Sequence, residues 1–247
     1  MKQFSFIRRL APAWLLLACL LGGLAPAVAV EPAPAGQQPL RIGIIGTGNI
    51  GGALATHWVQ AGHEVMISSR HPEQLEPLAA QLGPRAQVGT PAQAARFGDV
   101  VLVSVPYGAL PQIGRDLRTE LAGKVVIDTG NPYPGRDGAM AEQARREGAG
   151  IASQRYLPGT HLVRAFNAIS AGNLRSLAHR RGSLVAIPIA GDDARALQVA
   201  SQLVRDAGFE PVTVGGLAQA RRFDVGSPVY VQVMDAPQLR RALGLQQ

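Results

Sequence analysis

The sequence has a single cysteine, Cys19, among its 247 residues, so no intramolecular disulfide can form. Lysine is almost as scarce: only Lys2 and Lys124 are lysines, and the other basic residues are arginines. No basic cluster is longer than a pair such as Arg221-Arg222, and aromatic residues make up only 5% of the chain. Nucleic-acid surfaces usually show dense basic runs or aromatic-basic modules, so we exclude nucleic acid as a partner despite the net charge of +7.

Acidic residues are absent from the first 29 positions, which resemble a targeting segment. Lys2, Arg8 and Arg9 precede an apolar run, and Ala27-Val28-Ala29 matches an A-x-A cleavage site. We predict a signal peptide over residues 1–29, cleaved after Ala29 with Ala27 as the second choice, and therefore an exported, periplasmic protein. The export route, Sec or twin-arginine, stays open.

The apolar run, from Leu10 to about Leu24, is short for a bilayer span and contains Pro12. We therefore expect no stable membrane span in the mature chain, with retention as an N-terminal anchor as the alternative. Cleavage would also remove Cys19, which excludes thiol catalysis, cysteine-bound metals and Fe–S clusters. Residues 30–39, which contain three prolines, predict a flexible mature N-terminus.

From Leu40 onward, short β-branched runs alternate with longer amphipathic segments. The expected strands are 40–45, 63–68, 86–89, 99–105, 124–128, 161–166, 184–190 and 209–214. The expected helices are 49–62, 72–82, 91–97, 107–121, 138–148, 170–178 and 192–207. Such alternation predicts an α/β fold with a doubly wound, Rossmann-type, mostly parallel sheet. We expect one domain over 40–247, with a dinucleotide-binding core at about 40–167 and a C-terminal extension of the sheet with terminal helices over 168–247.

A glycine-rich turn follows the first expected strand and opens the first expected helix. Its sequence, Gly46-Thr47-Gly48-Asn49-Ile50-Gly51, matches the G-x-G-x-x-G fingerprint of dinucleotide-binding proteins. Gly46 permits the tight turn, Gly48 lets the backbone approach a pyrophosphate, and Gly51 lets helix and strand pack closely. The free N–H groups of the helix N-terminus then face the anion.

The end of the second expected strand indicates which dinucleotide binds. NAD sites place an Asp or Glu there for the ribose hydroxyls, whereas this chain has Ser68-Ser69-Arg70. An arginine matches a 2′-phosphate in charge and in bidentate geometry. The sequence therefore predicts NADP(H) in preference to NAD(H).

With these residues in view, the chain resembles the NADPH-dependent reductases of the deazaflavin coenzyme F-420. The same NADPH-binding module occurs in the cytosolic part of the six-transmembrane metalloreductases. The resemblance extends from about Leu40 to Tyr230. Besides the glycine-rich turn, the matching segments are Ser69-Arg70, Val103-Ser104-Val105-Pro106-Tyr107, Gly123 to Asp128, Asn131-Pro132, Val163-Arg164-Ala165-Phe166-Asn167, Ile189 to Asp193, and Gly216-Leu217 with Ala220-Arg221.

The resemblance implies a role for each matching residue. The turn that starts at Gly46 would hold the pyrophosphate with Thr47, Gly48, Asn49 and Ile50, and Ser69 and Arg70 would hold the 2′-phosphate. The ribose and nicotinamide would be lined by Val105, Pro106 and Ala109, which follow Ser104, while the Ala165 backbone would meet the carboxamide. Family members often carry another basic residue soon after the Ser-Arg pair. Glu73 and Gln74 stand there in this chain, which leaves a second cation in doubt.

No side chain is expected to catalyse the reaction, because hydride transfer between two rings needs mainly position and exclusion of water. None of the four tyrosines is followed by lysine four residues later, so the Tyr-x-x-x-Lys signature is absent. No H-x-x-x-H or H-E-x-x-H spacing occurs, so we predict no metal site. We interpret His57 and His63 as structural residues, and Asp192-Asp193 as the cap of the following helix.

Three functions remain open. The first is an NADPH-dependent oxidoreductase that transfers hydride between NADP(H) and a flavin-like or deazaflavin acceptor stacked on the nicotinamide. The second is a reductase of another acceptor, such as a quinone or a ferric chelate through bound flavin. The third is a non-catalytic NADP(H)-binding module. A homodimer is a further possibility, since Val229-Tyr230-Val231 and the final segment 237–243 could form a dimer surface or close the sheet.

Overall fold

The computed structural model describes Met1 and residues 39–246. The chain divides into two units, Met1–Gln37 and Gln38–Gln247, and the fold below is that of the second unit. The predicted signal peptide, its cleavage site and nearly all of segment 30–39 lie outside the described residues.

All eight expected strands are present and form one sheet in the order β3-β2-β1-β4-β5-β6-β7-β8. The strands are β1 (Arg41–Ile45), β2 (Glu64–Ser68), β3 (Ala86–Gly89), β4 (Val100–Val103), β5 (Val125–Asp128), β6 (His161–Arg164), β7 (Ala186–Gly191) and β8 (Glu210–Gly215). Every neighbouring pair is parallel except β6 and β7, which run antiparallel. The prediction of a doubly wound, mostly parallel Rossmann-type sheet is therefore confirmed, and the C-terminal extension continues the same sheet.

The helices lie between the strands. The α-helices are α1 (Asn49–Gln60), α2 (Glu76–Leu82), α3 (Pro91–Phe97), α4 (Leu110–Asp116), α5 (Arg118–Leu121), α6 (Pro134–Asp137), α7 (Ala139–Glu147), α8 (Ala149–Tyr156), α9 (Ala171–Ser176), α10 (Ala194–Asp206) and α11 (Ala236–Ala242). Three short 3₁₀ helices are η1 (Pro72–Leu75), η2 (Tyr107–Ala109) and η3 (Leu217–Arg222).

Several helical segments differ from the prediction, and α6 and η3 lie outside every expected helix. The expected helix over 107–121 is divided into η2, α4 and α5, with Pro111 in the first turn of α4, where its missing N–H is unneeded. Helix α8 was not expected, because Gly148 marks the end of the preceding helix. Gly148 does follow the end of α7, but its φ of 93° only turns the chain, and α8 begins at the next residue.

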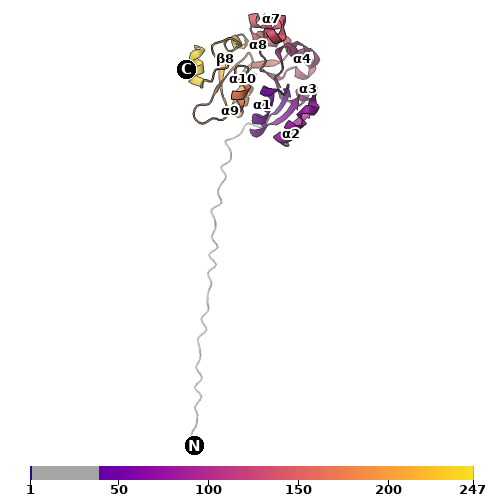
Figure 1. Ribbon diagram of the computed structural model, residues 1–247, viewed down its shortest axis with the longest axis vertical. Helices are drawn as coiled ribbons and strands as arrows, with labels where there is room; N and C mark the ends of the chain where they lie inside the picture. Colours follow the sequence, from indigo (N-terminus) through magenta and orange to yellow (C-terminus); the bar gives the residue numbers. More distant parts are fainter. Residues whose placement is uncertain (2–38, 247) are drawn as a thin grey trace. The chain divides into compact units, whose positions relative to one another are not determined.

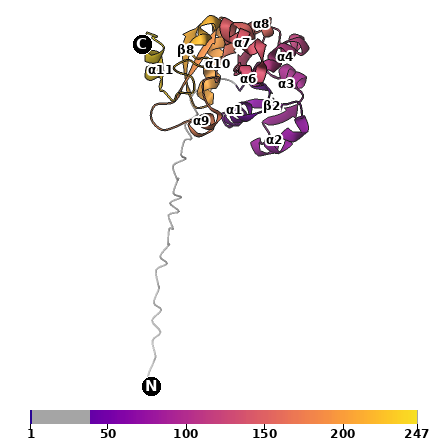
Figure 2. The same ribbon diagram turned by 45° about the horizontal axis from the view of Figure 1, so that its top comes forward.

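The side chains of the central strands alternate between two apolar clusters. Val100 and Leu102 face a cluster built with α1, α2 and α10, whereas Val101 and Val103 face one built with α3, α4, α7 and α8. Successive strand residues point to opposite faces, so a strand covered on both sides is apolar throughout. In Figures 1 and 2, α2 and α3 lie at one side of the domain and the C-terminal helix α11 lies at the other.

Polar contacts join α1 and the turn that follows it to later parts of the chain. The indole N–H of buried Trp58 donates to the Leu203 carbonyl of α10 at 2.8 Å. His57 Nε2 bonds the Leu174 carbonyl, and His63 Nε2 lies 3.0 Å from the Asp206 carboxylate. Both histidines are buried, which confirms that they serve the structure.

The C-terminal segments pack onto their own domain. Val229, Leu239 and Leu243 belong to a third apolar cluster with residues of β7 and β8. The Ala186 N–H at the start of β7 donates to the Met234 carbonyl at 2.8 Å. Segment 237–243 therefore closes the sheet, which is one of the two alternatives that the sequence left open.

Candidate functional site

The predicted site residues collect at one edge of the sheet. Because β1 to β6 are parallel, the loops that follow β2, β1, β4, β5 and β6 lie side by side at the carboxyl ends of these strands. The chain reverses its direction of winding between β1 and β4, and open α/β sheets bind ligands at such a switch point. The glycine-rich turn and the loop with Ser104 flank this point.

Hydrogen bonds fix the glycine-rich turn to the end of β2. The N–H groups of Gly46 and Thr47 both donate to the Ser68 carbonyl, at 3.0 and 3.1 Å. The Thr47 hydroxyl donates to the same oxygen at 3.0 Å, and the Ser68 hydroxyl donates to the Ile44 carbonyl at 2.7 Å. The turn and the following Ser69-Arg70 are therefore held as neighbours.

The three fingerprint glycines face different surroundings. Gly46 has a φ of 94°, and a Cβ there would lie 2.3 Å from the Ser104 carbonyl oxygen. A Cβ on Gly51 would lie 2.3 Å from the Gly46 oxygen, in line with the predicted close packing. A Cβ on Gly48 would meet no atom within 4 Å. Protein packing therefore explains Gly46 and Gly51, while Gly48 borders open space where a ligand can approach the backbone.

This contrast gives a matched pair of substitutions. We expect Gly46→Ala to lower the free energy of unfolding by about 2 kcal/mol or more, because it combines a strained φ with a clash against backbone. Gly48 has a φ of −86°, so Gly48→Ala should change stability by less than about 0.5 kcal/mol while weakening NADPH binding. Urea unfolding and NADPH titration would measure both effects. Equal destabilisation by the two variants would contradict this account.

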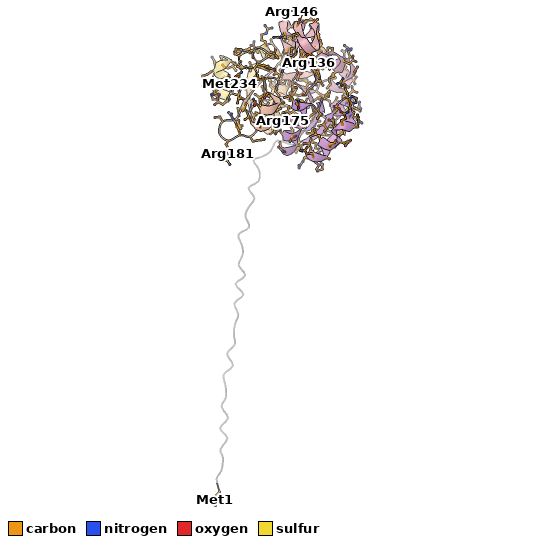
Figure 3. The ribbon with its side chains drawn as sticks, viewed as in Figure 1. Met1, Arg136, Arg146, Arg175, Arg181 and Met234 are labelled. Atoms are coloured by element: carbon orange, nitrogen blue, oxygen red, sulfur yellow. The ribbon has the colours of Figure 1, made fainter. Side chains whose placement is uncertain are left out.

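The N-terminus of α1 is open to a ligand. No side chain caps this helix, and Gly48 and Asn49 are exposed. They line one end of a cavity of about 480 Å³ that extends along α1 between Leu78 of α2 and Arg175 of α9. Arg175, labelled in Figure 3, donates from Nη1 to the Asn49 carbonyl at 3.3 Å. Ile50, also in the first turn, is half-buried.

The loop after β2 presents its cation to solvent. Arg70 is exposed and makes no ion pair among residues 39–246, while the Ser69 hydroxyl accepts from the His71 N–H at 3.0 Å. Glu73 lies 3.6 Å from His71, so the position of a second family cation carries a carboxylate instead. A single arginine is thus available where a 2′-phosphate would lie.

The loop after β4 follows the switch point directly. The Ser104 N–H still donates to the Ile45 carbonyl at 2.8 Å, but β4 ends at Val103 rather than at the predicted residue 105. Val105 is half-buried, and a Cβ on Gly46 would lie 2.7 Å from its Cγ1. Exposed Pro106 and half-buried Ala109 begin and end the short turn into α4.

The predicted carboxamide contact, Ala165, directly follows β6. Ala165 is fully buried, and its N–H donates to the Asp128 carbonyl at 3.3 Å. The N–H of Ala165 is therefore already paired within the protein. The structure thus places every predicted site residue in the loops at this edge or in the helical turns that follow them, from Gly46 to Ala165.

A buried charge network underlies this edge. The Arg164 guanidinium is 0% exposed and donates to Asp128 at 2.8 Å, to Asp224 at 3.1 Å and to the Gly130 carbonyl. Burial opposes the charge of Arg164, but Asp128 and Asp224 outweigh it and raise the pKa of the guanidinium above its ordinary value. Asp128 also accepts from the Gly130 N–H at 2.7 Å. The network therefore fixes the loop after β5.

Two tyrosines at this edge were not among the predicted site residues. The hydroxyls of Tyr133, after β5, and Tyr230, before α11, are hydrogen-bonded to each other. The Asn131 amide also donates to the Tyr230 hydroxyl at 3.3 Å. Burial and the neighbouring Tyr133 raise the pKa of Tyr230 above its ordinary value. The tyrosines are 97 positions apart in the sequence, so no local pattern connects them.

The two aspartates at 192 and 193 have different partners. Asp193 caps α10, as expected, by accepting from the Ala196 N–H at 2.7 Å, whereas Asp192 accepts from Leu217 at the start of η3. Within residues 39–246, no group of three or more His, Cys, Asp or Glu residues is placed to hold a metal ion. Over the same residues, no helix is both long and apolar enough to cross a membrane.

Comparison with protein families adds an independent finding. Residues 41–132, from β1 to the loop after β5, match the model of the family described as NADP oxidoreductase, coenzyme F420-dependent. A solved structure of a hypothetical protein from Sinorhizobium meliloti has a TM-score of 0.67 and 24% identity, and covers 80% of this chain and 96% of that one. This likeness shows the fold.

Two curated relatives extend the match. The F420-dependent NADP reductase of Methanothermobacter thermautotrophicus is 29% identical over 217 residues, which are 82% of this chain and 93% of the relative. Metalloreductase STEAP3 of Rattus norvegicus is 32% identical over 191 residues, which are 76% of this chain. The chain spans only 36% of the metalloreductase's length. By its fold and by these matches, the chain is similar to the coenzyme F420-dependent NADP oxidoreductases, whose family model matches its residues 41–132.

Proposed function

We propose that this NADP-dependent oxidoreductase transfers hydride between NADP(H) and a flavin-like or deazaflavin acceptor that stacks on the nicotinamide. The observation that carries the proposal is the row of loops at the carboxyl edge of the sheet. It begins at Arg70, crosses the glycine-rich turn at the switch point and ends at Ala165. A dinucleotide bound across this row would place its adenosine phosphate at one end and its nicotinamide at the other.

The residues at this edge fit NADP(H). Open space beside Gly48 and the uncapped N-terminus of α1 suit a pyrophosphate, which Thr47, Asn49 and Ile50 would surround. Arg70, with the Ser69 hydroxyl beside it, suits a 2′-phosphate, and no carboxylate stands at the end of β2 to favour NAD(H).

The acceptor end of the site relies on position rather than on a nucleophile. When bound, NADPH supplies the hydride. Val105, Pro106 and Ala109 would line the ribose and the nicotinamide, and the Ala165 carbonyl would accept from the carboxamide. The buried ion pair between Arg164 and Asp128 keeps the floor of this region fixed, which favours a reproducible distance between donor and acceptor rings.

Titration and turnover would test the proposal together. We expect purified protein to bind NADPH more tightly than NADH, and to oxidise NADPH when FMN or the deazaflavin coenzyme is added. Use of NADPH deuterated at the nicotinamide C4 would show whether the hydride itself is transferred, since the label must appear in the reduced deazaflavin. Tight NADPH binding with no oxidation by any ring acceptor would instead favour the non-catalytic module.

The similarity to a metalloreductase supports a second candidate. Metalloreductase STEAP3 matches 76% of this chain, so a ferric chelate reduced through bound flavin is the alternative acceptor. This candidate would be favoured if sustained NADPH oxidation required both flavin and a ferric chelate. Without the chelate, oxidation should then stop after one turnover of the flavin.

Export is proposed from the sequence of residues 1–29 alone. The basic start, the apolar run and Ala27-Val28-Ala29 support cleavage after Ala29 and a periplasmic location, with an N-terminal anchor as the alternative. Native mass spectrometry of the protein from its own envelope fraction would give the mature N-terminus and any bound nucleotide. A mass that includes residues 1–29 would overturn cleavage.

A further inference from the structure

The hydroxyl pair of Tyr133 and Tyr230 lies where an acceptor must approach. Tyr133 follows β5 by five residues and is 38% exposed, whereas Tyr230 is half-buried. Asn131 connects the pair to the loop after β6, because its amide donates to the Asn167 carbonyl at 2.8 Å. Asn167 is two residues from Ala165, the expected carboxamide contact. The pair therefore belongs to the nicotinamide end of the site.

The hydrogen bonds of Asn131 orient its amide toward the tyrosine pair. A carbonyl oxygen only accepts, so the contact with Asn167 fixes which end of the Asn131 amide is nitrogen. That nitrogen also donates to the Tyr230 hydroxyl oxygen at 3.3 Å, while the bond between the two hydroxyls can run in either direction. When Tyr230, the more buried of the two, donates to Tyr133, the Tyr133 proton has no acceptor among residues 39–246 and is available to a ligand.

Several contacts hold Tyr133 in place. The Arg136 guanidinium, labelled in Figure 3, lies 5.1 Å from the centre of the Tyr133 ring and donates to the Asn131 carbonyl at 2.9 Å. The Tyr133 N–H donates to Asp137 at 3.0 Å, and Asp137 also accepts from the Gly108 N–H at 3.1 Å. The loops after β4 and β5 are thus fastened together around this side chain.

The backbone is strained at both supporting loops. Phe166, next to Ala165, has a φ of 59°, and Val231, next to Tyr230, has a φ of 54°. A β-branched residue rarely adopts positive φ, and such strain collects at functional sites. The Val231 N–H donates to the Ala168 carbonyl at 3.0 Å, which ties the Tyr230 segment to the loop after β6.

We propose that Tyr133 donates a proton to the ring that accepts the hydride, and that Tyr230 and Asn131 position its hydroxyl. This inference rests on the proposed function. Hydride leaves the nicotinamide C4 with two electrons and bonds to the acceptor ring, and NADP⁺ results. The Tyr133 O–H bond breaks and its proton bonds to a ring nitrogen of the acceptor, which completes the two-electron reduction. Water returns a proton to the exposed tyrosinate.

The test compares Tyr133→Phe with the wild-type chain, using FMN and the deazaflavin coenzyme as acceptors. Single-turnover reduction by NADPH should slow about 10- to 100-fold. This loss is at or below the lower end of the usual contribution of a general acid, because water can replace the hydroxyl in part. Because water then supplies the proton, the solvent deuterium isotope effect should differ from that of the wild type. In protein loaded with NADP⁺, fluorescence titration should show a roughly 2- to 10-fold weaker binding of the oxidised acceptor, as loss of one hydrogen bond predicts.

Two further variants separate this role from a structural one. Tyr230→Phe keeps the Tyr133 hydroxyl and should show a smaller loss of rate, with the isotope effect retained. Tyr156→Phe, which removes a hydroxyl from α8, should behave as the wild type. A Tyr133→Phe variant with unchanged rate, isotope effect and acceptor binding would overturn the inference while leaving the proposed function intact. Failure of the wild type to reduce either acceptor would instead overturn the proposed function, and this inference with it.

Discussion

Replacing Arg164 by methionine should lower the free energy of unfolding by about 3–5 kcal/mol, as expected when one partner of a buried ion pair is removed. Arg164 and Asp128 are both 0% exposed, and the methionine would leave the Asp128 carboxylate without its cation. The Asp224 carboxylate and the Gly130 carbonyl would lose a donor as well. Urea unfolding followed by circular dichroism would measure the loss.

A double-mutant cycle would separate the ion pair from packing. Asp128→Asn removes the charge that Arg164→Met leaves uncompensated, so the double variant should be more stable than the sum of the two single effects predicts. Arg118→Met, at an exposed position in α5, should change stability by less than about 0.5 kcal/mol. Additive effects of the two buried substitutions would show that the network contributes no coupling.

The order of elements could be predicted from the sequence because local patterns determine it. Val100 to Val103 form an uninterrupted apolar run, which is expected only of a strand covered on both faces, and the structure covers both. The glycine-rich turn could be predicted for the same reason. Gly46 requires a positive φ and Gly51 a close approach, and both demands arise within a few residues of the chain.

The contacts that complete the site are not local. Arg164 meets Asp224 from 60 residues away, and Tyr133 meets Tyr230 from 97 residues away. No spacing rule connects such residues, since their meeting depends on how the segment after η3 crosses the carboxyl edge of the sheet. The Tyr-x-x-x-Lys signature includes a tyrosine too, but it applies only to residues one helical turn apart. The positive φ of Val231, which helps to direct Tyr230, is likewise unexpected for a β-branched residue.

Arg70→Gln should weaken NADPH binding on the order of 10²-fold and leave NADH binding unchanged, because an arginine–phosphate contact combines charge with hydrogen bonds worth about 1.5–3 kcal/mol each. Arg70 is exposed and makes no ion pair within the described part of the chain, so its removal should not alter the fold. Titration of nicotinamide fluorescence would give both dissociation constants, and the advantage of NADPH should shrink with rising salt in the wild type alone.

The arginine at position 85 supplies the matched control. Arg85 is also exposed, but it precedes β3 and so lies at the amino end of the parallel strands, away from the predicted phosphate. Arg85→Gln makes the same change in net charge, so any effect of overall charge on dinucleotide binding would appear in both variants. Only a loss confined to Arg70→Gln and to NADPH assigns the 2′-phosphate to this side chain. An equal loss for NADPH and NADH would place Arg70 on a part of the dinucleotide that both share, and selectivity would then have to come from elsewhere at the end of β2.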